Sequence, residues 1–483
     1  MNIRFWKVLG ALASALLVAF LLRHYTAEQR RIAATFVFTV ALWATEAFPL
    51  GISSLGGMVL LILVAGLDEP HAFSGLGNPI IPLYISSLIL AKAMETTGLG
   101  RRIALSIMGQ QWATTSPARL LFVVICITAS VSLFLSNTAT TAMMLPLALS
   151  VLVTLQQKDA HKPFAKALML ALSLGACVSV GTPIGTTPDL MAVSVLEQIA
   201  GIEIGFGKWM TFGVPITLLL LLTVWCVLGT FFNGEAPDVK AARATALLER
   251  QALGPTSHAE KVTLGVLLFA VFFWVVPDVA GQAFGHLAPA LNHWMQVRLT
   301  SHAVAVTSVL LLFLIPVRGT PGGNPITWKQ AAGIDWGVIL LLAAGISLGN
   351  AIFSCGLAQA LGVVLANALD AHTLWSITAL GIGAGMLLSE FTSNSVAAAA
   401  MLPVIIGLAQ SAGVSPAPPV LGTALGISLG VVFPFSSPTN AMIYGTGLVR
   451  QRDMILTGII IDLVGFGLIF GVLRVVLPVL GMA

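Results

Sequence analysis

Charged residues are scarce in this chain. Of its 483 residues, 9% are Asp, Glu, Lys or Arg, whereas 57% are hydrophobic. A soluble domain is about a quarter charged because its surface faces water. So few charges indicate a surface that faces lipid. The net charge of +4 is more typical of basic loops on one side of a membrane than of a nucleic-acid surface.

Motifs of several enzyme and pump classes are also absent. No histidine forms an HExxH motif, which argues against a zincin protease. The nearest approach to a phosphate loop, Gly207-Lys208, is followed by Trp209 rather than Ser or Thr. ATP-driven transport therefore has no support within the chain. The cysteines lie far apart in apolar stretches without metal-ligand spacing, which is typical of inert core thiols. They are Cys126, Cys177, Cys226 and Cys355.

Long apolar runs are what the sequence has instead. A helix needs about 20 apolar residues to cross a bilayer. Ordinary spans are expected near 5–22, 33–66 (two spans), 207–232, 261–276, 300–316 and 455–480. The first run resembles a signal peptide, but its length and the spans that follow favour an uncleaved span.

Two further apolar regions, 78–199 and 335–449, are repeatedly broken by Gly, Pro, Ser, Thr and Asn. Irregular backbone is not tolerated against lipid, so these breaks are expected to be buried in protein or to line a cavity. The fold predicted from these patterns is an all-α polytopic membrane protein.

The two broken regions resemble each other. Ser136-Asn137 recurs as Ser393-Asn394, 257 positions later, and both are followed by Ala and Met-Leu-Pro at equal spacing. Gly-Leu at 98–99 recurs at 356–357, and the Gly-Thr-Thr-Pro-Asp turn at 185–189 is echoed by Ser-Ser-Pro-Thr-Asn at 436–440. Three landmarks in one order predict an internal repeat. The expected divisions are an N-terminal span and connection at 1–32, a first repeat at 33–232, a polar linker at 233–260 and a second repeat at 261–483.

Charge predicts how the repeats are oriented. If 116–156 is a re-entrant hairpin, both its feet are basic and should be cytoplasmic, whereas the second hairpin has feet near 370–374 and 410–418 without Lys or Arg. Opposite entry is what an inverted-topology repeat predicts, with the substrate near the midplane where the repeats meet.

The two Ser-Asn tips have the chemistry of an anion site. Each supplies hydroxyls, an amide and the N-terminus of a following helix, which favours negative charge. Small polar residues also let helices pack closely, but the duplicated set favours binding. Neither tip contains Lys or Arg, and two helix ends contribute only about +0.5 charge each. A bound dianion therefore needs further positive charge, which sodium ions would bring. An exchanger would not need sodium ions if its binding site crossed the membrane only with substrate bound.

At these motifs the chain resembles the divalent anion/sodium symporter family, the dicarboxylate, citrate and sulfate carriers. The segments that carry the resemblance are Met94–Ala104, Thr138–Met144, Ser389–Asn394 and Phe433–Ala441. The resemblance implies sodium-coupled uptake of C4-dicarboxylates such as succinate, malate or fumarate, without enzymatic activity or an organic cofactor. It also implies two re-entrant hairpins, two unwound helices, and a dimerising scaffold with an elevator-type transport domain. The expected location is a bacterial inner (plasma) membrane.

The resemblance also implies site residues. Those expected to contact substrate are Ser136, Asn137, Thr138, Ser393, Asn394, Ser395, Thr186, Ser437 and Pro438. The first sodium site would involve Ser132, Ser136, Asn137 and Gly185. The second would involve Ser389, Thr392, Asn394 and Ser436.

Several positions depart from the family pattern. Ser395 replaces a common Thr, and Asp189 replaces a common Asn, where it would strengthen a cation site, titrate, or cap the following helix. The alternatives left open are a sodium-independent dicarboxylate exchanger, a sulfate or tricarboxylate carrier and, more distantly, a channel or an intramembrane enzyme. Ionisable residues within spans are also candidates for substrate contact or structural pairing. They are Glu46, Lys92, Glu95, Asp335 and Glu390.

Overall fold

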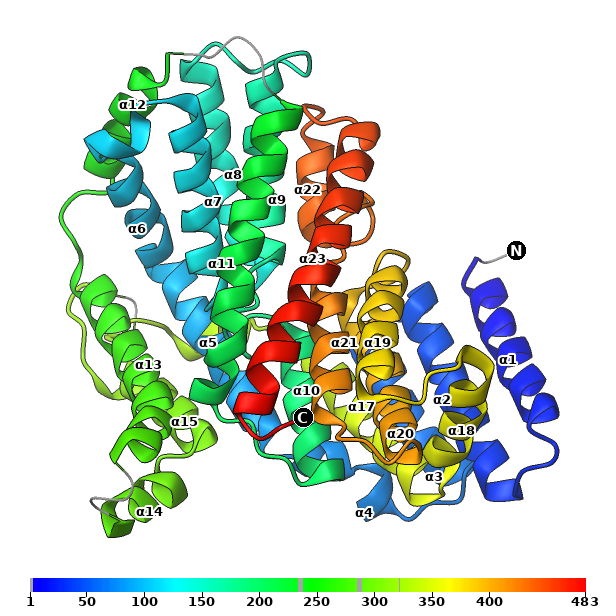
Figure 1. Cartoon of the computed structure of the whole chain (residues 1–483). Coiled ribbons are helices and arrows are strands. Elements are labelled where there is room, and N and C mark those ends of the chain that lie inside the picture. Colours follow the sequence, from blue (N-terminus) through cyan, green and yellow to red (C-terminus); the bar gives the residue numbers. More distant parts are fainter. Residues whose placement is uncertain (1–2, 233–237, 285–288, 321) are drawn as a thin grey trace.

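The computed structural model describes residues 3–232, 238–284, 289–320 and 322–483, and every regular element in them is helical (Figure 1). The first series of helices is α1 (Ile3–Leu21), α2 (Ala27–Thr45), α3 (Leu50–Leu63), α4 (Glu69–Ala72), η1 (Ser74–Gly77), α5 (Ile80–Thr97), α6 (Leu99–Met108), η2 (Gln111–Thr114), α7 (Pro117–Ser132), α8 (Asn137–Thr154), α9 (Pro163–Cys177), α10 (Thr187–Ala200) and α11 (Phe206–Phe231). The second is α12 (Lys240–Ala252), α13 (His258–Phe284), α14 (Pro289–Arg298), α15 (Ser301–Leu314), α16 (Trp328–Ala331), α17 (Trp336–Ser354), α18 (Leu357–Leu369), α19 (Leu374–Ser389), α20 (Asn394–Ser411), α21 (Ala417–Leu429), α22 (Pro438–Gly445) and α23 (Gln451–Val479).

Eight of the described helices are long and apolar enough to cross a bilayer, and seven shorter apolar helices accompany them. Each run expected to be an ordinary span is helical, as α1, α2 with α3, α11, α13, α15 and α23. The chain is therefore a multi-pass integral membrane protein. The region 233–260, expected to be a polar linker, contains the helix α12, which packs against α6 and α8; residues 233–237 lie outside the described part of the chain.

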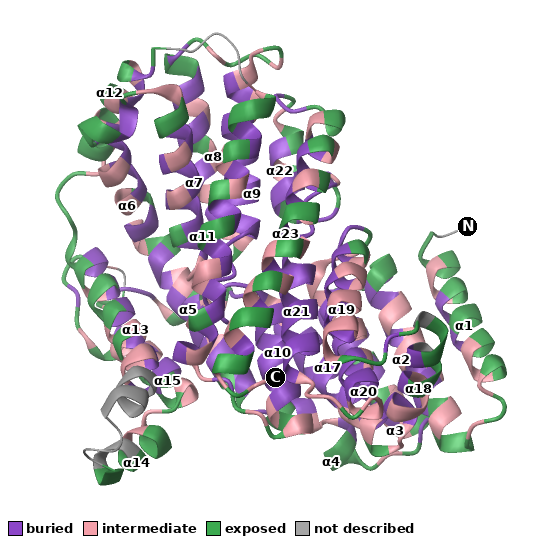
Figure 2. Cartoon of the chain, in the orientation of Figure 1, coloured by how far each residue is buried: buried purple, intermediate pink, exposed green. Residues whose placement is uncertain are grey.

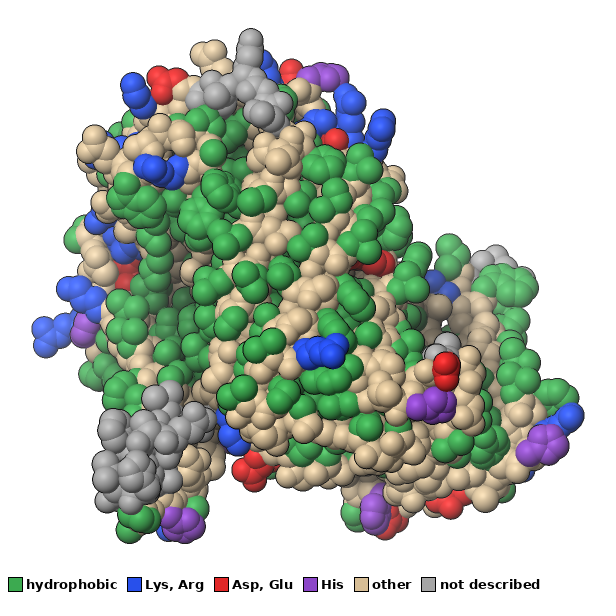
Figure 3. Space-filling view, viewed as in Figure 1, with side chains coloured by type: hydrophobic (Ala, Val, Ile, Leu, Met, Phe, Trp, Pro, Cys, Tyr) green, Lys and Arg blue, Asp and Glu red, His purple; other side chains and the backbone are tan. Residues whose placement is uncertain are grey.

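The helices differ in which faces are buried. Every residue of α21 is buried, and so are nearly all residues of α9, so both helices are enclosed by others (Figure 2). In contrast, α1 and α23 leave apolar side chains such as Leu463 exposed. Figure 3 shows hydrophobic side chains spread across one face, with charged side chains mainly toward its edges. Apolar surface of this extent is expected to face lipid.

Helices α19 and α21 make an unusually close pair. A Cβ atom on Gly426 would lie 2.7 Å from the Ile382 carbonyl oxygen, and one on Gly381 would lie 2.2 Å from Thr423 Oγ1. Small residues in such stripes let membrane helices approach backbone to backbone. The pair holds the second tip, since α19 leads directly into it.

Two helix–turn–helix units carry the Ser-Asn tips. Helices α7 and α19 each have 16 residues, and α8 and α20 each have 18. Two irregular segments, 178–186 between α9 and α10 and 430–437 between α21 and α22, lie beside these units, and each unit packs against one helix from each segment. The unit α7–α8 contacts α9 and α22, and the unit α19–α20 contacts α21 and α10.

Candidate functional site

The first tip lies between α7 and α8. Ser132, buried at the end of α7, donates its hydroxyl to Asn137 Oδ1 at 2.8 Å. Ser136 is the N-cap of α8, where its Oγ accepts the Ala139 N–H at 3.3 Å. A Cβ atom on Gly185 would lie 3.4 Å from the Ser132 carbonyl oxygen. Ser132, Asn137 and Gly185, three of the four residues expected at the first sodium site, therefore lie close together.

The second tip repeats this arrangement. Ser393 is the N-cap of α20 and accepts the Val396 N–H at 3.4 Å. A Cβ atom on Gly430 would lie 3.0 Å from both Asn394 Oδ1 and Ser389 Oγ. Ser436 donates its hydroxyl to the Gly430 carbonyl oxygen at 3.0 Å. Ser389, Asn394 and Ser436 therefore surround one glycine.

The amide oxygen of Asn394 is the most informative atom at this tip. It is buried and accepts no hydrogen bond from any described residue. A buried acceptor left without a donor costs about 1–3 kcal/mol. Because Gly430 has no side chain, no Cβ atom occupies the position 3.0 Å from this oxygen.

The remaining expected site residues are less closely joined. Thr138 and Pro438 are exposed, and Thr392 and Ser395 are half-buried. Among the described residues, no hydrogen bond joins the tip at 136–138 to the tip at 393–395. The structure thus forms two separate groups of oxygen atoms, one at each tip.

Each irregular segment ends at an N-cap that was expected to contact substrate. Thr186 is the N-cap of α10, and its Oγ1 lies 3.0 Å from Ser428 Oγ of α21. Ser437 is the N-cap of α22 and accepts the Asn440 N–H at 3.3 Å. All four N-caps therefore present hydroxyls at helix N-termini, where an anion is favoured.

Two serines that sequence reasoning missed hold these segments across the molecule. Ser173 of α9 donates to Asn440 and lies 3.1 Å from Thr439 Oγ1, both on α22. Ser428 of α21 lies 3.3 Å from Asp189 Oδ1 on α10. A signal was available, because Leu-Ser-Leu-Gly at 172–175 matches Ile-Ser-Leu-Gly at 427–430.

Glu390 has a structural role next to the second tip. Its carboxylate accepts the Val432 N–H at 3.0 Å and the Phe433 N–H at 3.2 Å. Glu390 therefore fixes the irregular segment between α21 and α22 through backbone N–H groups.

The other ionisable candidates lie at helix ends away from both tips. Lys92 pairs with Glu95 at 2.9 Å, and Asp335 is the N-cap of α17, where it accepts the Val338 N–H at 3.2 Å. Glu46 is exposed and ends α2 in a left-handed conformation. The structure gives none of them a contact with the tip residues.

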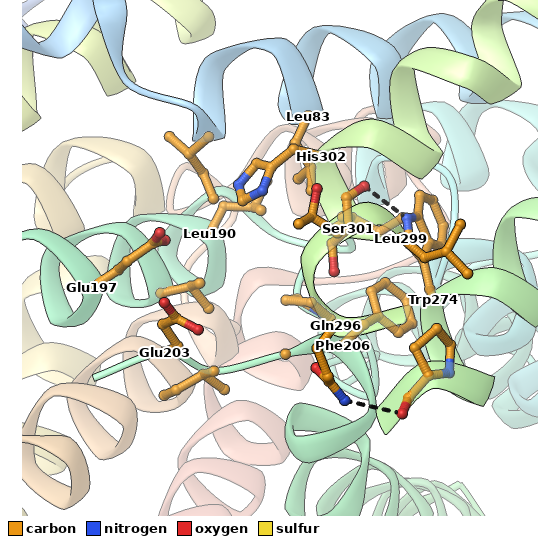
Figure 4. A pocket seen from close by; sticks show the side chains of 18 residues that line it. Leu83, Leu190, Glu197, Glu203, Phe206, Trp274, Gln296, Leu299, Ser301 and His302 are labelled. Atoms are coloured by element: carbon orange, nitrogen blue, oxygen red, sulfur yellow. Dashed lines mark hydrogen bonds between the residues drawn. The ribbon is translucent and has the colours of Figure 1, made fainter. Parts of the chain in front are cut away.

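A cavity of about 190 Å³ lies elsewhere, beside α10, α13 and α15 (Figure 4). Phe206 and Trp274 stack in its wall with ring centroids 4.8 Å apart. Glu197 and Glu203 also line it. It contains none of the expected site residues, and its two carboxylates oppose binding of a dianion.

The fold matches that of a solved membrane transporter. The crystal structure of the YdaH transporter of Alcanivorax borkumensis aligns with a TM-score of 0.56 at 14% identity, covering 98% of this chain and 97% of that one. The protein is therefore an all-helical, multi-span membrane protein that shares a transporter fold.

Sequence comparison gives the family. Residues 2–482 match the family model of the sodium:sulfate symporter transmembrane region. The chain therefore belongs to the sodium:sulfate symporter family. The resemblance noted from the motifs is thereby confirmed, and the family is one of transporters rather than enzymes.

Similar proteins include sodium-dependent dicarboxylate transporters of staphylococci. The transporter SdcS of Staphylococcus saprophyticus is 29% identical over 493 residues, which cover 99% of this chain and 92% of SdcS. SdcS of Staphylococcus aureus strain USA300 is 30% identical over 453 residues, which cover 90% and 84%.

Proposed function

We propose that this protein imports C4-dicarboxylates such as succinate, malate or fumarate together with sodium ions. The observation that carries the proposal is the pair of Ser-Asn tips, each with a helix N-terminus and a glycine-bearing segment beside it. The names of the staphylococcal relatives support both the cation and the substrate class.

Sodium is proposed to bind at both tips. The first site would use Ser132, Ser136, Asn137 and Gly185, and the second Ser389, Thr392, Asn394 and Ser436. Oxygen atoms are the ligands that hard cations prefer, and carbonyls of unwound helices commonly hold sodium in transporters. The unpartnered Asn394 oxygen beside Gly430 fits such an ion.

The dicarboxylate is proposed to bind between the same tips. Ser136, Asn137 and Thr138 would hold one carboxylate and Ser393, Asn394 and Ser395 the other, with Thr186, Ser437 and Pro438 lining the pocket. No Lys or Arg lies at either tip. Two helix ends contribute about +0.5 charge each, so the co-bound sodium ions complete the neutralisation of a dianion.

We further propose an inverted-repeat architecture that works as an elevator within a homodimer. The equal lengths of α7 and α19 and of α8 and α20 support two repeats. So does the reciprocal packing of α3 on α17 and of α15 on α5. In this scheme the repeats span 33–232 and 261–483, joined by 233–260 and preceded by 1–32. Each tip would belong to a re-entrant hairpin, and each irregular segment to an unwound helix.

Uptake of labelled succinate into proteoliposomes tests the function. We expect uptake into empty vesicles that requires an inward sodium gradient. Uptake only into succinate-loaded vesicles, indifferent to sodium, would instead establish exchange. The absence of succinate flux under every condition would reject the substrate and call for a panel that includes sulfate and citrate.

A further inference from the structure

Asp189 is a buried carboxyl for which the proposed function has no role. It lies in the first turn of α10 with 0% of its surface exposed. Its Oδ2 atom is buried and has no hydrogen-bond partner among the described residues. Its Oδ1 atom lies 3.3 Å from Ser428 Oγ.

The neighbouring hydroxyls cannot satisfy an ionised carboxylate. Ser428 has one hydroxyl hydrogen, and its better acceptor is the Ala424 carbonyl oxygen at 3.0 Å. The Thr186 hydroxyl also lies 3.0 Å from Ser428 Oγ. A carboxylate can only accept hydrogen bonds, so an ionised Asp189 would compete for the hydrogens of two hydroxyls that have other acceptors, and its Oδ2 accepts none.

No positive charge faces Asp189 from the helices packed against α10. Helices α17, α20 and α21 contain no titratable residue within their bounds. Helix α5 contributes the Tyr84 hydroxyl, 3.0 Å from Thr187 Oγ1, and the Lys92–Glu95 pair, whose members neutralise each other. On α10 itself the other titratable residue is Glu197. The helix N-terminus supplies only a partial charge, which does not neutralise a fully buried carboxylate.

Asn440 shows what the equivalent position in the other half requires. It follows Ser436-Ser437-Pro438-Thr439 as Asp189 follows the Gly-Thr-Thr-Pro turn. Its Nδ2 donates to the Phe433 carbonyl oxygen at 2.9 Å and to Ser436 Oγ at 3.1 Å, and its Oδ1 accepts the Ser173 hydroxyl. A protonated carboxyl also offers one acceptor and one donor. The neutral acid is therefore the form of Asp189 that matches Asn440.

We infer that Asp189 is a proton-binding site linked to binding of the transported dianion. The inference rests on the proposed function, because Thr186, which shares Ser428 with Asp189, is proposed to line the substrate pocket. An ionised Asp189 would place a negative charge beside the dianion. By linkage, protonation of Asp189 and binding of the dianion favour each other, so affinity for the dianion falls as pH rises through the range where Asp189 loses its proton.

The Asp189→Asn variant tests the linkage because it fixes the neutral form with almost no change of shape. We expect the succinate KM of the wild type to rise by up to about tenfold per pH unit in that range, the limit for one linked proton. In Asp189→Asn this rise of KM with pH should be absent, and the only remaining pH dependence of KM should come from titration of succinate itself. Asp370→Asn, a change at an exposed residue, should keep the wild-type profile.

An infrared spectrum of the purified protein tests the proton without transport. We expect a protonated-carboxyl C=O band that Asp189→Asn removes and Asp370→Asn retains. Absence of the band, or equal pH profiles for wild type and Asp189→Asn, would overturn the inference. A changed sodium concentration for half-maximal uptake in Asp189→Asn, with an unchanged pH dependence of KM, would also overturn the inference. That result would identify Asp189 as a cation ligand. If neither the wild type nor Asp189→Asn transports succinate, only the proposed function is rejected. The infrared band still shows whether Asp189 carries a proton.

Discussion

Asn137 and Asn394 occupy matched positions at the two tips but differ in their hydrogen bonds. Asn137 Oδ1 accepts the Ser132 hydroxyl at 2.8 Å, whereas Asn394 Oδ1 has no partner. Truncating Asn137 therefore removes a contact within the protein, whereas truncating Asn394 removes only an oxygen that is available to a ligand.

This difference predicts opposite effects on thermal stability. In sodium-free buffer we expect Asn137→Ala to lose about 1 kcal/mol of stability, the worth of a hydrogen bond. We expect Asn394→Ala to unfold above the wild-type temperature, because it removes a buried acceptor that no donor satisfies. Added sodium should raise the unfolding temperature of the wild type by mass action and have a much smaller effect on Asn394→Ala. Thermal unfolding in choline and sodium buffers measures both. An undiminished sodium effect in Asn394→Ala would contradict the second cation site.

Single residues also anchor the irregular segment between α21 and α22. We predict that Glu390→Ala destabilises the protein by about 1–3 kcal/mol, because the buried Val432 N–H and the part-buried Phe433 N–H lose their acceptor. Glu95→Ala is the control, since Glu95 makes a partly exposed ion pair worth at most about 1 kcal/mol. Chemical denaturation compares the two, and equal losses would show that Glu390 does not hold the segment.

At the scale of elements, the close pair α19–α21 depends on glycine. A side chain at Gly426 would meet the Ile382 backbone, which cannot move aside as a flexible side chain can. We predict that Gly426→Val separates the two helices, lowers the unfolding temperature and abolishes uptake. Gly383→Ala is the matched control on α19, because its Cβ would make an ordinary 3.6 Å contact with Phe466. Wild-type uptake by Gly426→Val would show that this contact is not needed to hold the second tip.

At the scale of the whole molecule, the proposed inversion of the repeats has a direct test. In a background without the native cysteines, Lys158→Cys and His372→Cys place one thiol at a foot of each tip unit, and both positions are exposed. We expect an impermeant maleimide to label His372→Cys on intact cells and Lys158→Cys only after permeabilisation, because basic loops stay on the cytoplasmic side. Labelling of both from the same side would reject inverted topology.

The membrane class, the positions of the apolar helices, the two tips and the family could all be predicted from the sequence. These features are local: apolar length decides whether a helix can span a bilayer, and a Ser before a helix caps it wherever it lies. Ser136 and Ser393 are N-caps for that reason.

Which polar atoms near the tips have hydrogen-bond partners could not be predicted from the sequence. Ser173 meets Asn440, Ser428 meets Asp189, and Glu390 meets Val432 across long separations in sequence. Such contacts depend on how helices that are distant in sequence pack together. The internal repeat places Asp189 opposite Asn440, but it does not specify whether the Asp189 carboxyl has a hydrogen-bond donor beside it. Asn394 Oδ1 and Asp189 Oδ2 therefore have no hydrogen-bond partner because of how the helices pack. The proposed cation binding by Asn394 and proton binding by Asp189 both depend on these unpartnered oxygen atoms.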